Sequence, residues 1–195
     1  MTPHQHQLEQ QIAKWLQSLL PPGRPRRVAR MSEPGEMKPE IVRDEAGRKV
    51  RTGRMVPRDK YEDIRAEQLT LAMLAEHARG SKTYSYTLDK GGQAREGAID
   101  VDQGGQAALL ALLRAGAELG VTLYAIENAS GEKHRGGHVR AIFDSLYPAG
   151  HIKALMKAIA ERAGVNTKEI WPGSNQGIRG ALGFHQTVQT RGQLL

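Results

Sequence analysis

Hydrophobic residues recur at helical spacing in four parts of the chain. Apolar positions repeat at intervals of three and four within residues 4–20, 64–78, 106–119 and 152–159, the pattern of amphipathic or buried helices. Each of the first three is closely followed by Pro or Gly, residues that end helices. We therefore predict four helices, the first of them an N-terminal amphipathic helix that either docks on the core or binds another chain.

The segments between these helices have the composition of strands. Runs rich in β-branched and aromatic residues, or with alternating apolar and polar positions, cover residues 83–88, 96–102, 121–126, 138–143, 168–171 and 178–184. The turn sequence Asp89-Lys90-Gly91-Gly92 predicts a β-hairpin between the first two. The order ββαββα followed by one or two strands predicts an α+β fold, with a mainly antiparallel or mixed sheet and helices packed on one side.

Composition divides the chain into three parts. The N-terminal helix occupies residues 1–20, and a compact domain occupies residues 61–195. Residues 21–60 contain few large apolar side chains and no sustained period, which predicts an extended or disordered linker. This segment holds twelve Lys or Arg and six Asp or Glu, so it carries +6 of the net charge of +7. It suits either a mobile phosphate-binding segment or a solvated linker without a partner.

The absence of cysteine narrows the chemistry. With no Cys in 195 residues, disulfides, thiolate zinc sites and Cys nucleophiles are excluded, and a bound metal needs oxygen or imidazole ligands. No apolar run is long enough to span a bilayer, and the first ten residues are polar and rich in His and Gln. We expect a cytoplasmic, nucleoid-associated protein with no membrane partner.

Two aspartates end one predicted strand. Because side chains alternate along a strand, Asp100 and Asp102 project from one face while Ile99 and Val101 enter the core. At a rise of about 3.3 Å per residue the carboxylates lie about 7 Å apart, and a divalent cation relieves their repulsion. Such a pair is also common as solubilising residues at a hairpin end.

A segment rich in Gly and cations follows in residues 127–138, and we expect a polar loop over residues 128–137. Its small residues allow backbone N–H groups and cationic side chains to surround a phosphate, and His138 begins the next strand, where an imidazole can donate a hydrogen bond or act as general acid. The candidate phosphate-binding residues are Ser130, Lys133, Arg135, Gly136, Gly137 and His138. An ordinary surface turn has the same composition.

Glu169 is the third candidate acid. It heads the short apolar stretch Ile170-Trp171, which Pro172 ends. If this strand lies beside the one that carries Asp100, Glu169 completes a three-carboxylate site for one or two Mg²⁺ or Mn²⁺ ions. An isolated strand-end residue is the alternative.

Together these motifs resemble the archaeo-eukaryotic primase superfamily, particularly its primase-polymerase branches. The family has a strand ending in D-x-D, as in Asp100-Val101-Asp102, then a Ser/Gly-rich stretch closing on G-x-H, as from Ser130 to His138. An acidic residue near an aromatic and Pro follows, as in Glu169-Ile170-Trp171-Pro172. The resemblance covers about residues 61–190. Arg140 departs from it, because the family often has an apolar residue there.

The resemblance implies an RNA-recognition-motif-like or ferredoxin-like sheet and the activity of a template-dependent nucleotidyltransferase, a primase or polymerase. It implies that Asp100, Asp102 and Glu169 bind two Mg²⁺ or Mn²⁺ ions, and that Ser130, Lys133, Arg135 and His138 hold the NTP or dNTP substrate, with Arg140 and Arg179 as further candidates for phosphate or template contacts. The partners are then single-stranded or primed DNA or RNA, and also further domains of a longer polypeptide or other replication or defence proteins.

Two other functions remain open. A metal-dependent nuclease or phosphodiesterase uses the same acidic and His residues. A non-catalytic module that binds single strands is the second alternative, but such sheets usually stack bases on aromatic side chains. Aromatics are only 5% of this chain, and residues 95–102 contain none, which counts against the binding module.

Overall fold

The structure is a computed structural model. It describes residues 2–19, 28–31, 35–43, 48–57, 61–64, 70–101, 104–130, 134–167, 169–173, 177–180, 184–185 and 190–194. Over these residues the fold is α+β, with four helices and three antiparallel sheets, which confirms the predicted class. The RNA-recognition-motif-like or ferredoxin-like subclass stays a prediction. None of the described helices is long and apolar enough to cross a membrane.

The main sheet positions the candidate site. In the described chain its strands follow the order β10 (Ile170–Trp171), β7 (Gln93–Val101), β9 (His134–Pro148), β8 (Leu123–Ser130), β13 (Thr190–Leu194) and β12 (Phe184–His185), and β6 (Asp89–Lys90) also pairs with β7. Strand β7 therefore lies between β10 and β9. The acidic motif and the His motif consequently occupy neighbouring strands.

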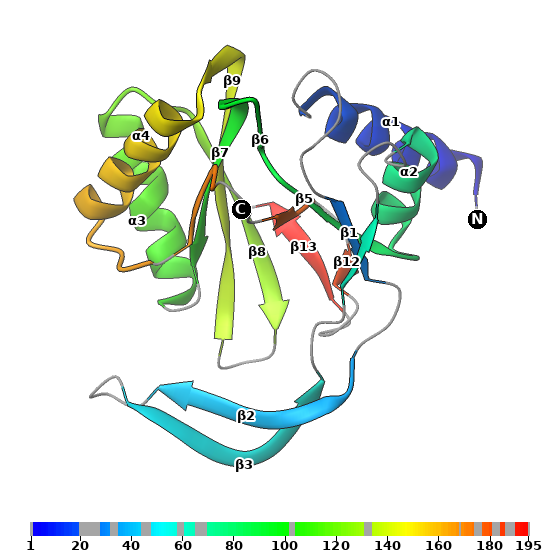
Figure 1. Ribbon diagram of the computed structural model, residues 1–195, viewed down its shortest axis with the longest axis horizontal. Helices are drawn as coiled ribbons and strands as arrows, with labels where there is room; N and C mark the ends of the chain where they lie inside the picture. Colours follow the sequence, from blue (N-terminus) through cyan, green and yellow to red (C-terminus); the bar gives the residue numbers. More distant parts are fainter. Residues whose placement is uncertain are drawn as a thin grey trace.

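Helices α3 (Gly105–Glu118) and α4 (Ala149–Arg162) cover one face of this sheet (Figure 1). Alternation sends Ile99 of β7 and Val139 of β9 to this face, where they are fully buried against Leu112 and Met156. Gly97 allows α4 to approach closely, because a Cβ there would lie 2.7 Å from Cγ of Met156. The core of the domain is thus on the helix-covered face, behind the candidate site.

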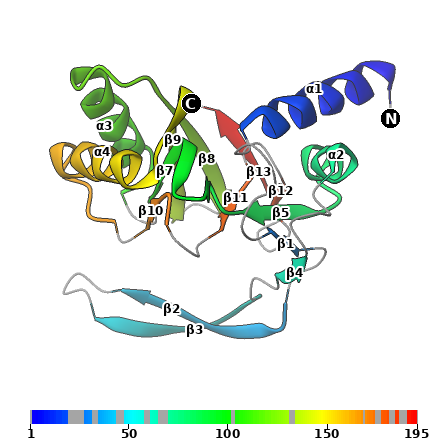
Figure 2. The same ribbon diagram turned by 45° about the horizontal axis from the view of Figure 1, so that its top comes forward.

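The opposite face is covered by a second sheet and two more helices. That sheet has the order β11 (Ile178–Arg179), β5 (Thr83–Tyr86), β1 (Val28–Met31) and β4 (Glu62–Ile64). Helices α1 (Pro3–Leu19) and α2 (Leu71–Arg79) lie on this side, away from α3 and α4 (Figures 1 and 2). Two clusters hold the layers together: Tyr84, Tyr86, Leu88, Ala98, Trp171 and Ile178, and Ala13, Leu16, Leu74, Ala75 and Ile126. Helix α1 therefore docks on the core.

Strands β2 (Met37–Arg43) and β3 (Lys49–Pro57) form a separate two-stranded sheet. In both views this hairpin, which we call the arm, projects away from the main body (Figures 1 and 2). Met37, Ile41 and Met55 are each more than half exposed on it.

Four predicted features differ from the structure. The helix predicted within residues 64–78 begins only at Leu71, and Ile64 belongs to strand β4. The helices lie on both faces of the main sheet, because the second sheet and α2 cover the face expected to be open. Strand β5 does not pair with β7 among the described residues; the hairpin that uses the Gly91-Gly92 turn joins β6 to β7. Residues 21–60 contain strands β1, β2 and β3 where we predict an extended or disordered linker.

The reason for the last difference is physical. Strand β1 spans only four residues and pairs with residues 62–64 and 83–86, which are distant in the chain. The arm exposes both apolar and charged side chains, so it lacks the alternation that reveals a half-buried strand.

Candidate functional site

Three candidate site residues lie in one row across the main sheet. In the antiparallel pairing of β7 with β9, Asp100 lies opposite His138. In the pairing of β7 with β10, Ile170 lies opposite Ile99, so Glu169 lies beside Asp100. The backbone N–H of Asp100 donates to the carbonyl oxygen of Glu169 at 3.0 Å. Residues opposite one another project from the same face. The structure therefore brings Glu169, Asp100 and His138 together as a row, which we call the acidic row.

The acidic row is partly sheltered. The Nε2 atom of His138 is 3.2 Å from Oδ1 of Asp100, and these side chains are only 13% and 19% exposed. The indole of Trp171 meets the imidazole edge to face, with ring centroids 6.4 Å apart. Glu169 is exposed at the edge strand. The row thus combines an oriented Asp–His pair with a carboxylate open to solvent.

Thr167 fixes the backbone beneath the row. Its Oγ1 atom donates to the carbonyl oxygen of Asp100 at 2.7 Å and accepts from the backbone N–H of Glu169 at 3.2 Å. One hydroxyl therefore links the two acidic residues. Sequence patterns did not reveal this role, because a Thr in a connection between elements has no distinguishing spacing.

Several predicted residues lie wholly or partly outside the described part. Asp102 and Lys133 are outside it, and for Ser130 and Arg135 the structure describes the strand but not the side chain. Among the described residues, no group of three or more His, Asp or Glu could hold a metal ion. Asp100 and Glu169, whose backbones are hydrogen-bonded, nevertheless carry carboxylates, the donors that hard divalent cations prefer, so the residues present fit such an ion in chemical type.

The expected glycine-rich loop is mostly strand. Strands β8 and β9 continue to Ser130 and from His134, so only residues 131–133 separate them. Gly137 lies opposite Val101 on one side and Glu127 on the other, and Gly136 lies opposite Asn128. Backbone groups of a central strand are used in the sheet, so the prediction of a loop over residues 128–137 was wrong. Glycine indicates a turn in sequence, but cross-strand pairing overrides that preference here.

Arg140 is buried inside the protein. Its guanidinium is fully buried in an ion pair with Glu96 at 2.5 Å and donates to the carbonyl oxygen of Arg179. Burial by itself would lower the pKa of Arg140, but the charge of Glu96, the nearby Tyr124 and Tyr86, and the hydrogen bond to Glu96 together outweigh it, and the pKa is raised. Arg140 therefore links β9 to β11 through a hydrogen bond, and we leave it out of the proposed nucleotide contacts. Arg179 itself is half-buried on β11.

Glu96 is a residue that the sequence analysis missed. It is 1% exposed, and the hydroxyl of Tyr124 lies 3.4 Å from its Oε1 atom. Burial, followed by the charge of Glu96, raises the pKa of Tyr124. The sequence contained a sign of this buried pair. Alternation along β7 places Glu96 on the same face as Ala98 and Asp100, and the facing strand β9 carries an Arg on that face.

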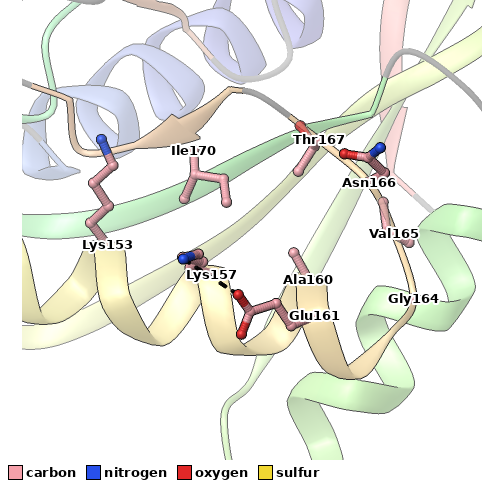
Figure 3. Close-up of a pocket in the computed structure, with 9 residues that line it drawn as sticks. All are labelled: Lys153, Lys157, Ala160, Glu161, Gly164, Val165, Asn166, Thr167 and Ile170. Atoms are coloured by element: carbon pink, nitrogen blue, oxygen red, sulfur yellow. Dashed lines mark ion pairs between the residues drawn. The ribbon is translucent and has the colours of Figure 1, made fainter.

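A pocket of about 500 Å³ lies beside the edge strand (Figure 3). Helix α4, the connection that follows it and β10 form its walls. Its lining residues are Lys153, Lys157, Ala160, Glu161, Gly164, Val165, Asn166, Thr167 and Ile170. Thr167 lines the pocket and also contacts the backbone of Asp100 and Glu169, so it connects the pocket to the acidic row.

Comparison with known proteins leaves the family open. No protein-family model and no curated protein sequence matches this chain. Among solved structures, the fold is similar to the polymerase domain of Mycobacterium tuberculosis Ligase D in complex with DNA, at 14% sequence identity and a TM-score of 0.45, over 94% of this chain and 80% of that one. A likeness this distant identifies neither a family nor a function.

Proposed function

We propose that the protein is a template-dependent nucleotidyltransferase, a primase or polymerase that adds NTPs or dNTPs to DNA or RNA. The observation that carries the proposal is the register of β10, β7 and β9, which aligns Glu169, Asp100 and His138 on one face. These residues are separated by 31 or more positions in the sequence. Their convergence joins the ends of all three sequence motifs.

The chain supplies the groups that phosphoryl transfer requires. Asp100, Asp102 and Glu169 would hold two Mg²⁺ or Mn²⁺ ions, which when bound lower the pKa of an attacking hydroxyl and neutralise a triphosphate. Phosphoryl transfer depends mainly on positioning and charge neutralisation. Asp100 orients the imidazole of His138 through Nε2, and in our proposal His138 donates a hydrogen bond to a phosphate oxygen.

Cations beyond the row complete the proposal. Ser130 and Arg135 belong to strands β8 and β9, which extend beyond His138. Together with Lys133, which lies outside the described residues, and Arg179, we assign them to the triphosphate. The strand positions of Gly136 and Gly137 remove them from an anion-binding loop.

The arm is the proposed contact for the nucleic-acid strand. Lys38, Lys49, Arg51 and Arg54 are exposed along it. Lys and Arg side chains that neutralise phosphates bind nucleic acid without regard to sequence. The arm therefore suits a template or primer backbone.

A template-dependent incorporation assay tests the activity. With primed and unprimed templates, Mg²⁺ or Mn²⁺, and NTPs or dNTPs, we expect the wild-type protein to lengthen or synthesise strands, and Asp100→Asn and Glu169→Gln each to reduce the rate at least about 100-fold, the scale of lost electrostatic stabilisation. Asp144→Asn, an exposed acid in β9, is the matched control and should retain activity. Full activity of both site variants would overturn the proposal.

The same assay separates the alternatives. Shortening of a labelled strand without nucleotides would identify a metal-dependent nuclease or phosphodiesterase. A binding module without catalysis would need an open aromatic platform, but Tyr84, Tyr86 and Trp171 are buried between the two sheets. This burial favours an enzyme.

A further inference from the structure

The pocket beside β10 has walls of two chemical kinds. Ala160 of α4, Val165 of the connection and Ile170 of β10 are apolar, and all are at least partly buried. Lys153 and Lys157 are exposed, lie one helical turn apart on α4 and both line the pocket (Figure 3). The pocket is thus an apolar recess with positive charge at its rim.

The charges at the rim do not cancel. Lys157 pairs with Glu161 at 3.5 Å, and both side chains are about two-thirds exposed, at 68% and 66%. Such an exposed pair is weak and easily exchanged for another partner. Lys153 has no acidic partner among the residues that the structure describes. The rim therefore retains a net positive charge and favours an anion.

The size and lining restrict the ligand. About 500 Å³ lies within the range of roughly 300–1,000 Å³ typical of small-molecule sites, which are usually apolar with a few placed polar groups. Asn166 offers a side-chain amide that both donates and accepts hydrogen bonds. An apolar recess, one amide and two ammonium groups match a ring with polar edges that carries a phosphate.

We propose that this pocket binds a nucleoside phosphate unit, with the phosphate between Lys153 and Lys157 and the base over Ile170 beside Asn166. The choice of a nucleotide rests on the proposed function. The unit comes either from a free nucleotide or from a nucleic-acid strand, and both share this chemistry. The site is distinct from the acidic row, because Ile170 faces the helix-covered side of the sheet.

Thr167 connects the pocket to the acidic row. Thr167 lines the pocket, and its hydroxyl contacts the backbone of both Asp100 and Glu169. A ligand that orders the connection around Thr167 also orders the backbone of the two acids. A nucleotide in the pocket therefore steadies the acidic row.

Binding is tested on the full chain in EDTA, which keeps the proposed metal site out of the measurement. The probes are dTMP, AMP, inorganic phosphate and an oligothymidylate of six nucleotides. Their binding is measured by the changes in backbone amide NMR shifts. We expect saturable shifts at Gly164, Val165, Asn166 and Thr167 with a nucleotide or the oligonucleotide. Phosphate alone should bind at least about tenfold more weakly, because it leaves the apolar walls uncovered.

Substitutions decide whether the pocket is the site. Lys153→Ala with Lys157→Ala should weaken nucleotide binding about tenfold or more, as expected for lost charge-assisted hydrogen bonds. Both lysines are exposed, so the fold should survive. Lys14→Ala, an exposed helical lysine on α1, is the matched control and should bind as wild type. Unchanged affinity in the double variant, or equal affinity for phosphate and nucleotide, would overturn the inference.

The different probes show whether the ligand is a free nucleotide or part of a strand. The outcomes also separate the pocket inference from the polymerase proposal. Shifts with dTMP or AMP but not the oligonucleotide identify a free-nucleotide site, and the reverse identifies a strand site; either supports the inference. If incorporation is absent in every assay while the nucleotide still shifts residues 164–167, the polymerase proposal fails and the pocket stands. If incorporation occurs without any such shift, the pocket inference fails alone.

Discussion

Asp100 is fixed by more than its place in a strand. The hydroxyl of Thr167 contacts its carbonyl oxygen, and its N–H donates to Glu169. The side chain then meets His138. The first two contacts come from residues 167–169 and the third comes from β9, so the geometry of the carboxylate depends on two segments that are distant from β7 in the sequence.

Replacement of Thr167 tests this dependence. Thr167→Val keeps the shape but removes the hydroxyl, and the loss of about 1 kcal/mol per hydrogen bond should reduce the incorporation rate about fivefold or more. Thr167→Ser keeps the hydroxyl and should restore the rate. The measurement is kcat and KM for incorporation by both variants, and a Val variant as active as the wild type would contradict the role of the hydroxyl.

The buried ion pair of Arg140 and Glu96 leads to a prediction about the free energy of unfolding. Arg140→Met leaves Glu96 as an unpaired buried charge and should lower the free energy of unfolding by about 3–5 kcal/mol. Arg140→Met combined with Glu96→Leu removes both charges and should recover much of that loss. Urea denaturation of the two variants measures the difference. A single variant as stable as the wild type would contradict the buried-pair interpretation.

For single residues, the sequence indicated which side chains are candidates for the site but did not indicate which residues contact them. Asp100, His138 and Glu169 were found from motifs and alternation, but the contact of Glu169 with Asp100 depends on the register of β10, a two-residue strand. Register arises from tertiary pairing, which local patterns do not contain. The resemblance made Arg140 a candidate for phosphate or template contact, whereas in the structure its ion pair with Glu96 accounts for its burial.

At the level of elements, helix α2 is tied to strand β5 by a polar contact. The hydroxyl of Tyr84 donates to Oε2 of Glu76 at 2.7 Å, and Nζ of Lys82 lies 3.0 Å from its other carboxylate oxygen. Burial would raise the pKa of Glu76, but the hydrogen bonds from Tyr84 and Lys82 outweigh it, and the pKa lies below its ordinary value of 4.5. Ionised Glu76 therefore stabilises the packing of α2 on β5.

The pH dependence of this contact follows from the direction of the shift. Because the folded-state pKa is lowered, the stabilisation is present above the unfolded-state pKa and disappears as pH falls through the folded-state value. Tyr84→Phe should raise the pKa of Glu76, seen by NMR titration of its carboxyl carbon, and reduce the loss of stability on acidification. Tyr147→Phe, an exposed tyrosine on β9, should leave that titration unchanged.

Elements with a strong period were predicted well, and those defined by pairing were not. The apolar spacing of α1, α3 and α4 gave all three helices to within a few residues. Strand β5 was assigned to a hairpin with β7, because its neighbour in sequence was taken as its neighbour in space. In the structure it pairs with β1 and β11. Chain-distant pairing of this kind leaves no trace in a local window.

Across the whole molecule, positive charge is concentrated on an arm that stands apart from the core. Lys38→Ser, Arg51→Ser and Arg54→Ser together should weaken binding of single-stranded nucleic acid and reduce the slope of log affinity against log salt by about 2, at roughly 0.7 per lost phosphate contact. Fluorescence polarisation at several salt concentrations measures the slope. Thermal stability should not change, because these side chains are exposed.

A charge-matched variant serves as the control. Lys14→Ser, Lys90→Ser and Arg114→Ser remove three exposed cations from other surfaces. A salt slope reduced equally by both triple variants would show that net charge, and not the arm, governs binding.

The overall class was predictable, while the layering was not. Helical and strand periods in alternation lead to an α+β fold by general packing rules. The second sheet, however, draws β1 from residues 21–60, whose composition is that of a linker. Composition reports the average exposure of a segment, and a strand of four residues changes that average little.

Glu169 directly precedes β10, an edge strand of only two residues, so the opening of this strand can be measured at the site. Short edge elements open locally far more often than the protein unfolds. The amide proton of Asp100 is bonded to the Glu169 carbonyl, so its exchange with deuterated water reports how often β10 detaches. A single protection factor thus measures the fraction of time during which the two acids are held together.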